Sequence, residues 1–81
     1  MQFDMDDKEF QRLLNTMGKS LYRIRKETDV SAEQLQQKSG IHRNTIVNYE
    51  NGAASPTLRI IAVLADALGY KVSIGFSKKE E

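Results

Sequence analysis

The chain has 81 residues, with 12 lysines and arginines against 11 carboxylates, and no cysteine. This length suits one small domain with a modest hydrophobic core. The absence of cysteine excludes disulfides and thiolate–zinc sites as a source of further stability. We therefore expect a homodimer to supply it. No long apolar run is present, and the first twenty residues carry four carboxylates, so we expect a cytoplasmic protein with neither a signal peptide nor a membrane span.

The first predicted element is a long helix over about residues 6–28. Apolar residues recur there at steps of three and four, which puts them on one face of a helix. Asp4 is the expected N-cap. Gly18 lies within this span and costs about 1 kcal/mol relative to alanine, so it is the expected position of any bend. The apolar face comprises Phe10, Leu13, Leu14, Met17, Leu21 and Ile24.

Two short helices joined by a glycine turn are predicted next. Ser31 is a strong N-cap for the first helix. Gly40 ends that helix, because glycine tolerates the positive φ of such a turn. The second helix covers residues 43–50, so the two helices are close enough in sequence to pack against each other.

A fourth helix and a strand complete the predicted elements. Thr57 caps the helix and Gly69 ends it. Residues 70–77 then alternate between apolar and polar side chains, which is the pattern of a β-strand. The residues that the fourth helix is expected to bury are Leu58, Ile61, Leu64, Ala65 and Leu68.

The predicted strand has no partner within an otherwise helical chain. Its backbone N–H and C=O groups are available to another chain, so we expect it to pair antiparallel with the same strand of a second copy across a two-fold axis. The predicted dimerisation residues are Tyr70, Val72, Ile74 and Phe76.

The outer side of the predicted helix 43–50 carries residue types that bind base edges. Arginine bonds guanine with two hydrogen bonds, asparagine bonds adenine in the same way, and a threonine methyl fits against thymine. The other side carries apolar residues, and the major groove of duplex DNA is wide enough to admit an α-helix. We therefore predict base contacts from Arg43, Asn44, Thr45 and Asn48.

Phosphate contacts are predicted at the helix ends, where free backbone N–H groups attract anions. Residues 19–59 carry seven Lys and Arg against four Asp and Glu, whereas residues 1–18 carry two against four. Because this basic excess is modest, we expect few phosphate contacts and a shallow salt dependence. The predicted phosphate-contacting residues are Ser31, His42, Asn51, Thr57 and Arg59.

No set of residues points to catalysis, a metal or a cofactor. His42 is the single histidine, and no cysteine or carboxylate pair at ligand spacing accompanies it. No serine belongs to a set with a base and an orienting acid, and there is no glycine-rich phosphate loop. We therefore expect a protein that is not an enzyme.

A pattern runs through the middle of the chain, made of Arg25, Ser31, Leu35, Gly40, Ile46, Tyr49-Glu50-Asn51-Gly52, Pro56, Leu58, Leu64 and Ala67-Leu68-Gly69. With these residues, the segment 18–69 resembles the XRE family of helix-turn-helix proteins, which includes phage repressors and Cro proteins. The resemblance implies a mainly α, lambda-repressor-like bundle of four to five helices, with one C-terminal β-strand that pairs across a homodimer. It also implies a salt bridge between Arg25 and Glu50, and contact between Leu35 and Ile46 where the two short helices cross.

Two positions depart from the family pattern. Ala32 stands where many relatives have a glutamine that binds phosphate, and Gln36 stands where alanine permits close helix packing. We therefore expect an altered approach of the two short helices, and moderate affinity unless a dimer adds avidity. The predicted divisions are an N-terminal helical extension (1–17), a DNA-binding domain (18–69), a dimerisation strand (70–77) and a disordered tail (78–81).

Three functions are compatible with these features. The leading hypothesis is a homodimeric repressor that binds a palindromic double-stranded DNA operator with helix 43–50 in the major groove. The second is an antitoxin, similar to HipB-type antitoxins, that binds a toxin protein and represses its own operon. The third is a protein-interaction module that does not bind DNA. Co-purification with a larger protein would favour the second function, and a mobility-shift assay would separate the third from the other two.

Overall fold

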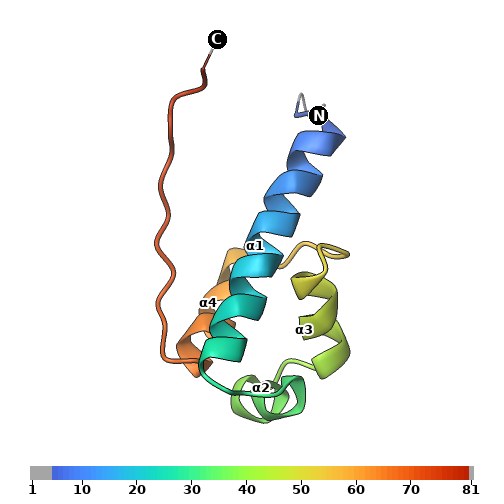
Figure 1. Cartoon of the computed structure of the whole chain (residues 1–81), viewed down its shortest axis with the longest axis vertical. Helices are drawn as coiled ribbons and strands as arrows, with labels where there is room; N and C mark the ends of the chain where they lie inside the picture. The colour runs from blue at the N-terminus through green and yellow to red at the C-terminus, as the bar shows by residue number, and fades with distance from the viewer. Residues whose placement is uncertain (1–4, 81) are drawn as a thin grey trace.

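The structure, a computed structural model, describes residues 5–80 and contains four helices in that range (Figure 1). All four lie where the sequence predicts a helix, so the mainly α bundle is confirmed. In Figure 1, α3 and α4 lie on either side of α1, and α2 crosses below them. No helix within the described range is long and apolar enough to span a membrane. The helices are α1 (Asp7–Glu27), α2 (Ala32–Ser39), α3 (Arg43–Glu50) and α4 (Leu58–Ala67).

Asp6 is the residue that caps α1. Its carboxylate accepts a hydrogen bond of 2.9 Å from the backbone N–H of Lys8, which satisfies one of the free donors at the helix start. Asp4, the expected cap, lies outside the described residues. The first turn is acidic, with Asp7 and Glu9, and this charge suits the positive end of the helix dipole.

The hydrophobic core lies where the C-terminal half of α1 meets the other three helices. Leu35 of α2, Ile46 of α3 and Leu64 of α4 are fully buried there, next to Leu21 of α1. Leu35 and Ile46 belong to the same buried cluster, as the resemblance implies. Burial of each of these side chains stabilises the fold by about 1.5–3 kcal/mol.

Two predicted apolar stripes are buried along only part of their length. Leu58, which was expected in the core, is 59% exposed at the start of α4. Phe10 and Leu13 of α1 are also exposed, because the N-terminal half of α1 extends beyond the bundle (Figure 1). Helical periodicity predicts which face of a helix is apolar, but it carries no information on how far the neighbouring elements cover that face.

Gly18 does not interrupt α1, which is one continuous helix. Gly18 lies where the backbones of α1 and α3 approach each other. A Cβ atom at this position would overlap the carbonyl oxygen of Tyr49 and lie 2.6 Å from that of Glu50. A larger residue would therefore force α1 and α3 apart, so glycine here sets the distance between the two helices.

The predicted C-terminal strand is not formed: residues 70–80, as far as the structure describes the tail, contain no strand. The backbone N–H of Tyr70 donates to the carbonyl of Ala65 at 2.9 Å, and the Tyr70 hydroxyl lies 3.2 Å from Glu27 Oε2. A strand is defined by hydrogen bonds to a neighbouring strand, and a single chain of four helices offers no such neighbour. The segment instead extends beside α1 toward its N-terminal end (Figure 1).

Candidate nucleic-acid interface

The segment from α2 to α3 is a helix, a tight turn and a second helix. At the start of α2, Ser31 Oγ accepts a bond of 3.1 Å from the Gln34 N–H, and Gln34 Oε1 accepts a bond of 2.8 Å from the Ser31 N–H. Gly40 ends α2 with φ at 81°, a value that other residues rarely adopt. At the start of α3, His42 Nδ1 accepts a bond of 3.1 Å from the Asn44 N–H. Local hydrogen bonds thus define where both helices begin.

Helix α3 has a buried side and an exposed side. Ile46 and Tyr49 are buried in the core. Asn44 and Asn48 lie four residues apart and so share the side of the helix opposite Ile46 and Tyr49, and Arg43, the first residue of α3, lies at the border of that side. Three of the four predicted base-contacting residues are exposed there, namely Arg43, Asn44 and Asn48.

Two other positions of α3 differ from the prediction. Thr45, predicted to contact bases, is only half-exposed. Val47, which the sequence analysis passed over, is exposed. The signal for Val47 was present, because it follows the buried Ile46 directly and so lies off the three- and four-residue steps of the buried side. An exposed valine beside Asn48 has the right chemistry to contact a thymine methyl group.

A buried ion pair joins α1 to α3 behind this exposed side. Arg25 Nε lies 2.7 Å from Glu50 Oε2, and Arg25 Nη2 lies 3.0 Å from Glu50 Oε1. Arg25 is only 8% exposed, and its Nη1 also donates to the Val30 carbonyl at 3.0 Å. The hydrogen bond to Glu50 raises the pKa of the Arg25 guanidinium. The salt bridge that the resemblance implies is therefore present, and it fixes the C-terminal end of α3.

Arg43 is held both at its backbone and at its side chain. Its backbone N–H donates to Gln36 Oε1 at 2.8 Å, and its Nη1 lies 2.9 Å from Glu33 Oε1. Gln36, which departs from the family pattern, thus supplies an additional cap for α3. The hydrogen bond from its own backbone, followed by the bond from Arg43, lowers the pKa of the Glu33 carboxyl, so this carboxyl is ionised at neutral pH. No pattern in the sequence points to a role for Glu33.

The predicted phosphate-contacting residues lie at or near helix ends. Ser31, His42 and Thr57 are N-caps, and Thr57 Oγ1 accepts a bond of 3.1 Å from a backbone N–H in the first turn of α4. Asn51 ends α3, and Arg59 is exposed in the first turn of α4. Their capping positions are clear, and their contact with phosphate stays a prediction.

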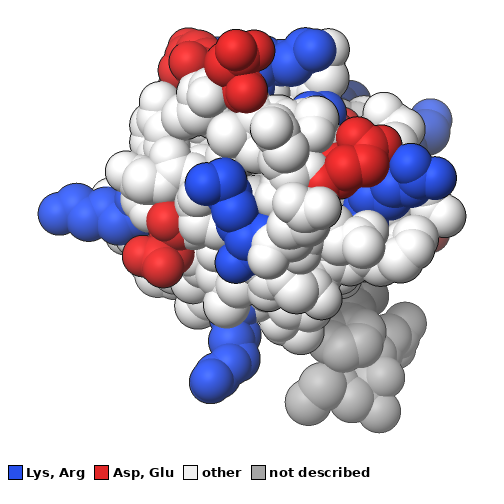
Figure 2. All heavy atoms as spheres, turned by 90° about the horizontal axis from the view of Figure 1, so that it is seen from below, with Lys and Arg blue, Asp and Glu red and all other residues white. Residues whose placement is uncertain are grey.

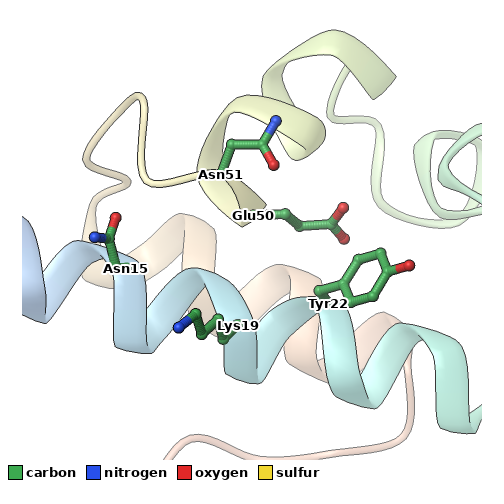
Figure 3. A pocket seen from close by; sticks show the side chains of 5 residues that line it. All are labelled: Asn15, Lys19, Tyr22, Glu50 and Asn51. Atoms are coloured by element: carbon green, nitrogen blue, oxygen red, sulfur yellow. The ribbon is translucent and has the colours of Figure 1, made fainter.

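An open hollow of about 610 Å³ lies between α1 and the C-terminal end of α3 (Figure 3). Lys19 on α1 and Asn51, the C-cap of α3, both line it, and each carries N–H donors. The carboxylate of Glu50 is already neutralised by its ion pair, so it opposes an anion here less than a free carboxylate does. Lys19 is therefore a further phosphate candidate, which its place in the sequence did not single out. The lining residues are Asn15, Lys19, Tyr22, Glu50 and Asn51.

The chain matches a family model described as helix-turn-helix over residues 21–74. It belongs to the XRE-type helix-turn-helix family. The immunity repressor protein of Bacillus phage phi105 is 33% identical over 58 residues, which are 72% of this chain and 40% of that relative. This chain thus spans less than half the length of that relative. The predicted family is confirmed, and it indicates a DNA-binding regulator of transcription.

The charges on this helix-turn-helix protein are dispersed. Figure 2 views the end of the molecule that α2 forms, and it shows Lys and Arg side chains set apart from one another among uncharged atoms and a few carboxylates. Strong attraction to phosphate requires several cations close together. This face therefore agrees with the expectation of few phosphate contacts and a shallow salt dependence.

Proposed function

We propose that the protein is a homodimeric transcriptional repressor that binds a palindromic double-stranded DNA operator with α3 in the major groove. The observation that carries this proposal is the two-sided character of α3, in which Ile46 and Tyr49 attach the helix to the core while Arg43, Asn44 and Asn48 are exposed. Base contacts need side chains held on a rigid support, and the core and the buried ion pair provide one. A repressor ranks before an antitoxin because the relative is named an immunity repressor.

The exposed residues of α3 divide the work of base recognition by their chemistry. Arg43 donates to the two acceptors of a guanine, and Asn44 or Asn48 forms the corresponding pair with an adenine. The methyl groups of Thr45 and Val47 contact thymine. Each pair with two hydrogen bonds discriminates against a wrong base by about 1–3 kcal/mol. Three such residues therefore give the protein a moderate preference for its operator over other sequences.

Phosphate contacts orient α3 on the duplex. Caps satisfy only part of the free N–H groups in the first turn of a helix, and the remaining ones at α2 and α4 are available to phosphate oxygens. These contacts fix the position of the protein along the DNA but do not select a sequence. The residues proposed for this role are Ser31, His42, Asn51, Thr57, Arg59 and Lys19.

The C-terminal segment 70–77 supplies the dimer interface in this proposal. Its apolar residues are exposed, Phe76 completely so at 100%, and exposed apolar patches mark interaction surfaces in soluble proteins. Antiparallel pairing with a second copy satisfies the backbone and covers these side chains together. A palindromic site requires the two copies of α3 to lie about 34 Å apart, one helical turn of DNA, and the proposed two-fold axis has to meet this spacing.

Selection of bound duplexes from a random pool, followed by substitution of Arg43→Ala, tests the DNA-binding function. The parent chain is expected to enrich one symmetric sequence. The variant should bind that sequence about 1–3 kcal/mol more weakly and lose its preference at one base pair in each half-site. Arg12→Ala, which removes an exposed arginine from the far end of α1, is the matched control and should change neither quantity. Enrichment of no sequence by the parent chain would favour the protein-interaction module instead.

Deletion of residues 70–81 tests the proposed interface. Analytical ultracentrifugation is expected to show a dimer for the full chain and a monomer for the shortened one. Because two linked half-site contacts give avidity, operator affinity should fall by about 10²–10⁴-fold. A shortened chain that still sediments as a dimer would move the interface to the helices. Co-purification of the full chain with a larger protein would instead support the antitoxin function.

A further inference from the structure

The side chain of Arg43 is anchored before any ligand arrives. Its Nη1 lies 2.9 Å from Glu33 Oε1, and the two side chains are 53% and 59% exposed. The ion pair therefore lies on the surface of the molecule, beside the start of α3 and between the two helices of the motif. It contributes little to stability, because exposed pairs are solvated and their side chains lose entropy. Its effect is on the conformation of Arg43.

The two ends of this contact are fixed independently. The backbone of Arg43 is held by the bond of 2.8 Å from its N–H to Gln36 Oε1. Glu33 lies in the first turn of α2, which the reciprocal bonds between Ser31 and Gln34 hold in place. Because the backbone positions of both partners are set, the carboxylate favours those conformations of the Arg43 side chain that keep Nη1 within hydrogen-bond distance of Glu33.

The geometry of the guanidinium favours guanine over the other bases when Arg43 is held in this way. It carries five N–H donors in a planar fork, and the structure assigns Nη1 alone to Glu33. The donors on Nε and Nη2 remain available. Guanine is the base that presents two acceptors, O6 and N7, in the major groove. An arginine already oriented loses less side-chain entropy when it forms such a pair.

The charge of Glu33 has a second consequence. At neutral pH its carboxyl is ionised, since its own backbone N–H and Arg43 lower its pKa. The ion pair neutralises much of the charge of Arg43, so the guanidinium attracts phosphates of any sequence less strongly than an unpaired arginine does. Sequence-independent binding is therefore weakened, whereas a site with a correctly placed guanine compensates through Arg43.

We propose that Glu33 is a specificity-determining positioning residue, which orients the Arg43 guanidinium toward guanine and weakens binding to DNA of unrelated sequence. This inference rests on the proposed function, in which α3 enters the major groove. It predicts that one substitution shifts two quantities in opposite directions. Removal of the carboxylate should lower discrimination at the base pair that Arg43 contacts, and should tighten binding to unrelated duplexes.

The test uses the full chain, the selected duplex, the same duplex with the guanine assigned to Arg43 replaced by adenine, and a duplex of unrelated sequence. Glu33→Gln should reduce the ratio of affinities for the guanine and adenine duplexes by about five- to tenfold, and should tighten binding to the unrelated duplex by a few-fold at low salt. Asp66→Asn changes the net charge equally from an exposed position on α4, and should leave the ratio unchanged. In an Arg43→Ala background, Glu33→Gln should have no effect on the ratio.

Two results would overturn the inference. A ratio that rises with Glu33→Gln would mean that the carboxylate withholds Arg43 from DNA, and an unchanged ratio would mean that Arg43 finds guanine without it. In both cases the parent chain still selects its duplex, so the proposed function stands. A parent chain that binds all duplexes alike would refute the proposed function and this inference together. Circular dichroism of each variant verifies that the helices are retained.

Discussion

The two ends of this molecule differ in how far a single chain provides hydrogen-bond partners for their polar groups and covers their apolar side chains. At the end formed by α2 and α3, the helix starts are capped, the ion pair of Arg25 and Glu50 is buried, and Leu35 and Ile46 are fully covered. At the opposite end, Leu13 of α1 is 57% exposed, and residues 70–80 contain no strand within the described part of the chain. The two ends are joined by one continuous helix, α1 (Figure 1).

This difference fits the two roles that we propose for the domain, base recognition and dimerisation. A surface that selects bases must be rigid before DNA arrives, because ordering it on binding costs affinity. A surface that pairs with a second copy is completed by that copy, so its side chains remain exposed in one chain. The contrast therefore supports recognition at the α2–α3 end and dimerisation at the end formed by the first half of α1 and the C-terminal segment.

Removal of the buried Glu50 carboxylate is expected to destabilise the end formed by α2 and α3 more than any other substitution proposed below. Glu50→Ala leaves the Arg25 guanidinium buried with the Val30 carbonyl as its remaining hydrogen-bond acceptor. The loss of one member of a buried pair costs about 3–5 kcal/mol. Urea unfolding measures this loss. Arg23→Ala removes an exposed pair with Glu27 at 3.4 Å and should cost less than about 1 kcal/mol. Equal effects of the two variants would show that the Arg25 pair is solvated.

The same substitution at the two ends tests the comparison directly. Leu35→Ala empties a fully buried position and should cost about 2–5 kcal/mol. Leu13→Ala removes an exposed side chain from the first half of α1 and should change stability by less than about 0.5 kcal/mol when the protein is dilute. At high concentration, Leu13→Ala should lower the dimer population in sedimentation if that surface is covered by a second copy. A large loss from Leu13→Ala in dilute solution would mean that the two ends are equally complete.

Local signals explain what the sequence could predict. The four helices and the N-caps Ser31 and Thr57 follow from steps of three and four residues and from polar residues at helix starts, and the contact between Leu35 and Ile46 follows from the family resemblance. Each of these local signals lies within a few residues of the feature that it predicts. The pattern of α3 similarly placed Asn44 and Asn48 on the side opposite Ile46 and Tyr49, because the helix period determines that face, whereas the exposure of Arg43 follows from its position at the first residue of the helix.

The features that the sequence did not reveal depend on tertiary distances. The contact from Glu33 to Arg43 joins residues ten positions apart on different helices, and no periodic pattern links them. The exposure of Leu58 depends on where the neighbouring elements end, which its own helix does not encode. The strand predicted for residues 70–77 requires hydrogen bonds to another strand, so its formation is a property of an assembly and not of the single chain.

The smallest expected effect concerns Gln36, whose amide oxygen accepts the Arg43 N–H at 2.8 Å. Gln36→Ala removes one cap from α3 while His42 continues to accept from Asn44, so the expected loss of stability is about 0.5–1.5 kcal/mol. Alanine is also the better helix former, which offsets part of that loss. Gln37→Ala, at the exposed neighbouring position, has the same helix-propensity gain and no bond to lose, so the difference between the two variants in urea unfolding isolates the cap. Hydrogen exchange at the Arg43 amide should accelerate in Gln36→Ala alone. If it does not, His42 alone holds the start of α3, and the hydrogen bond from the Arg43 N–H to Gln36 does not contribute to the rigidity of the α2–α3 end.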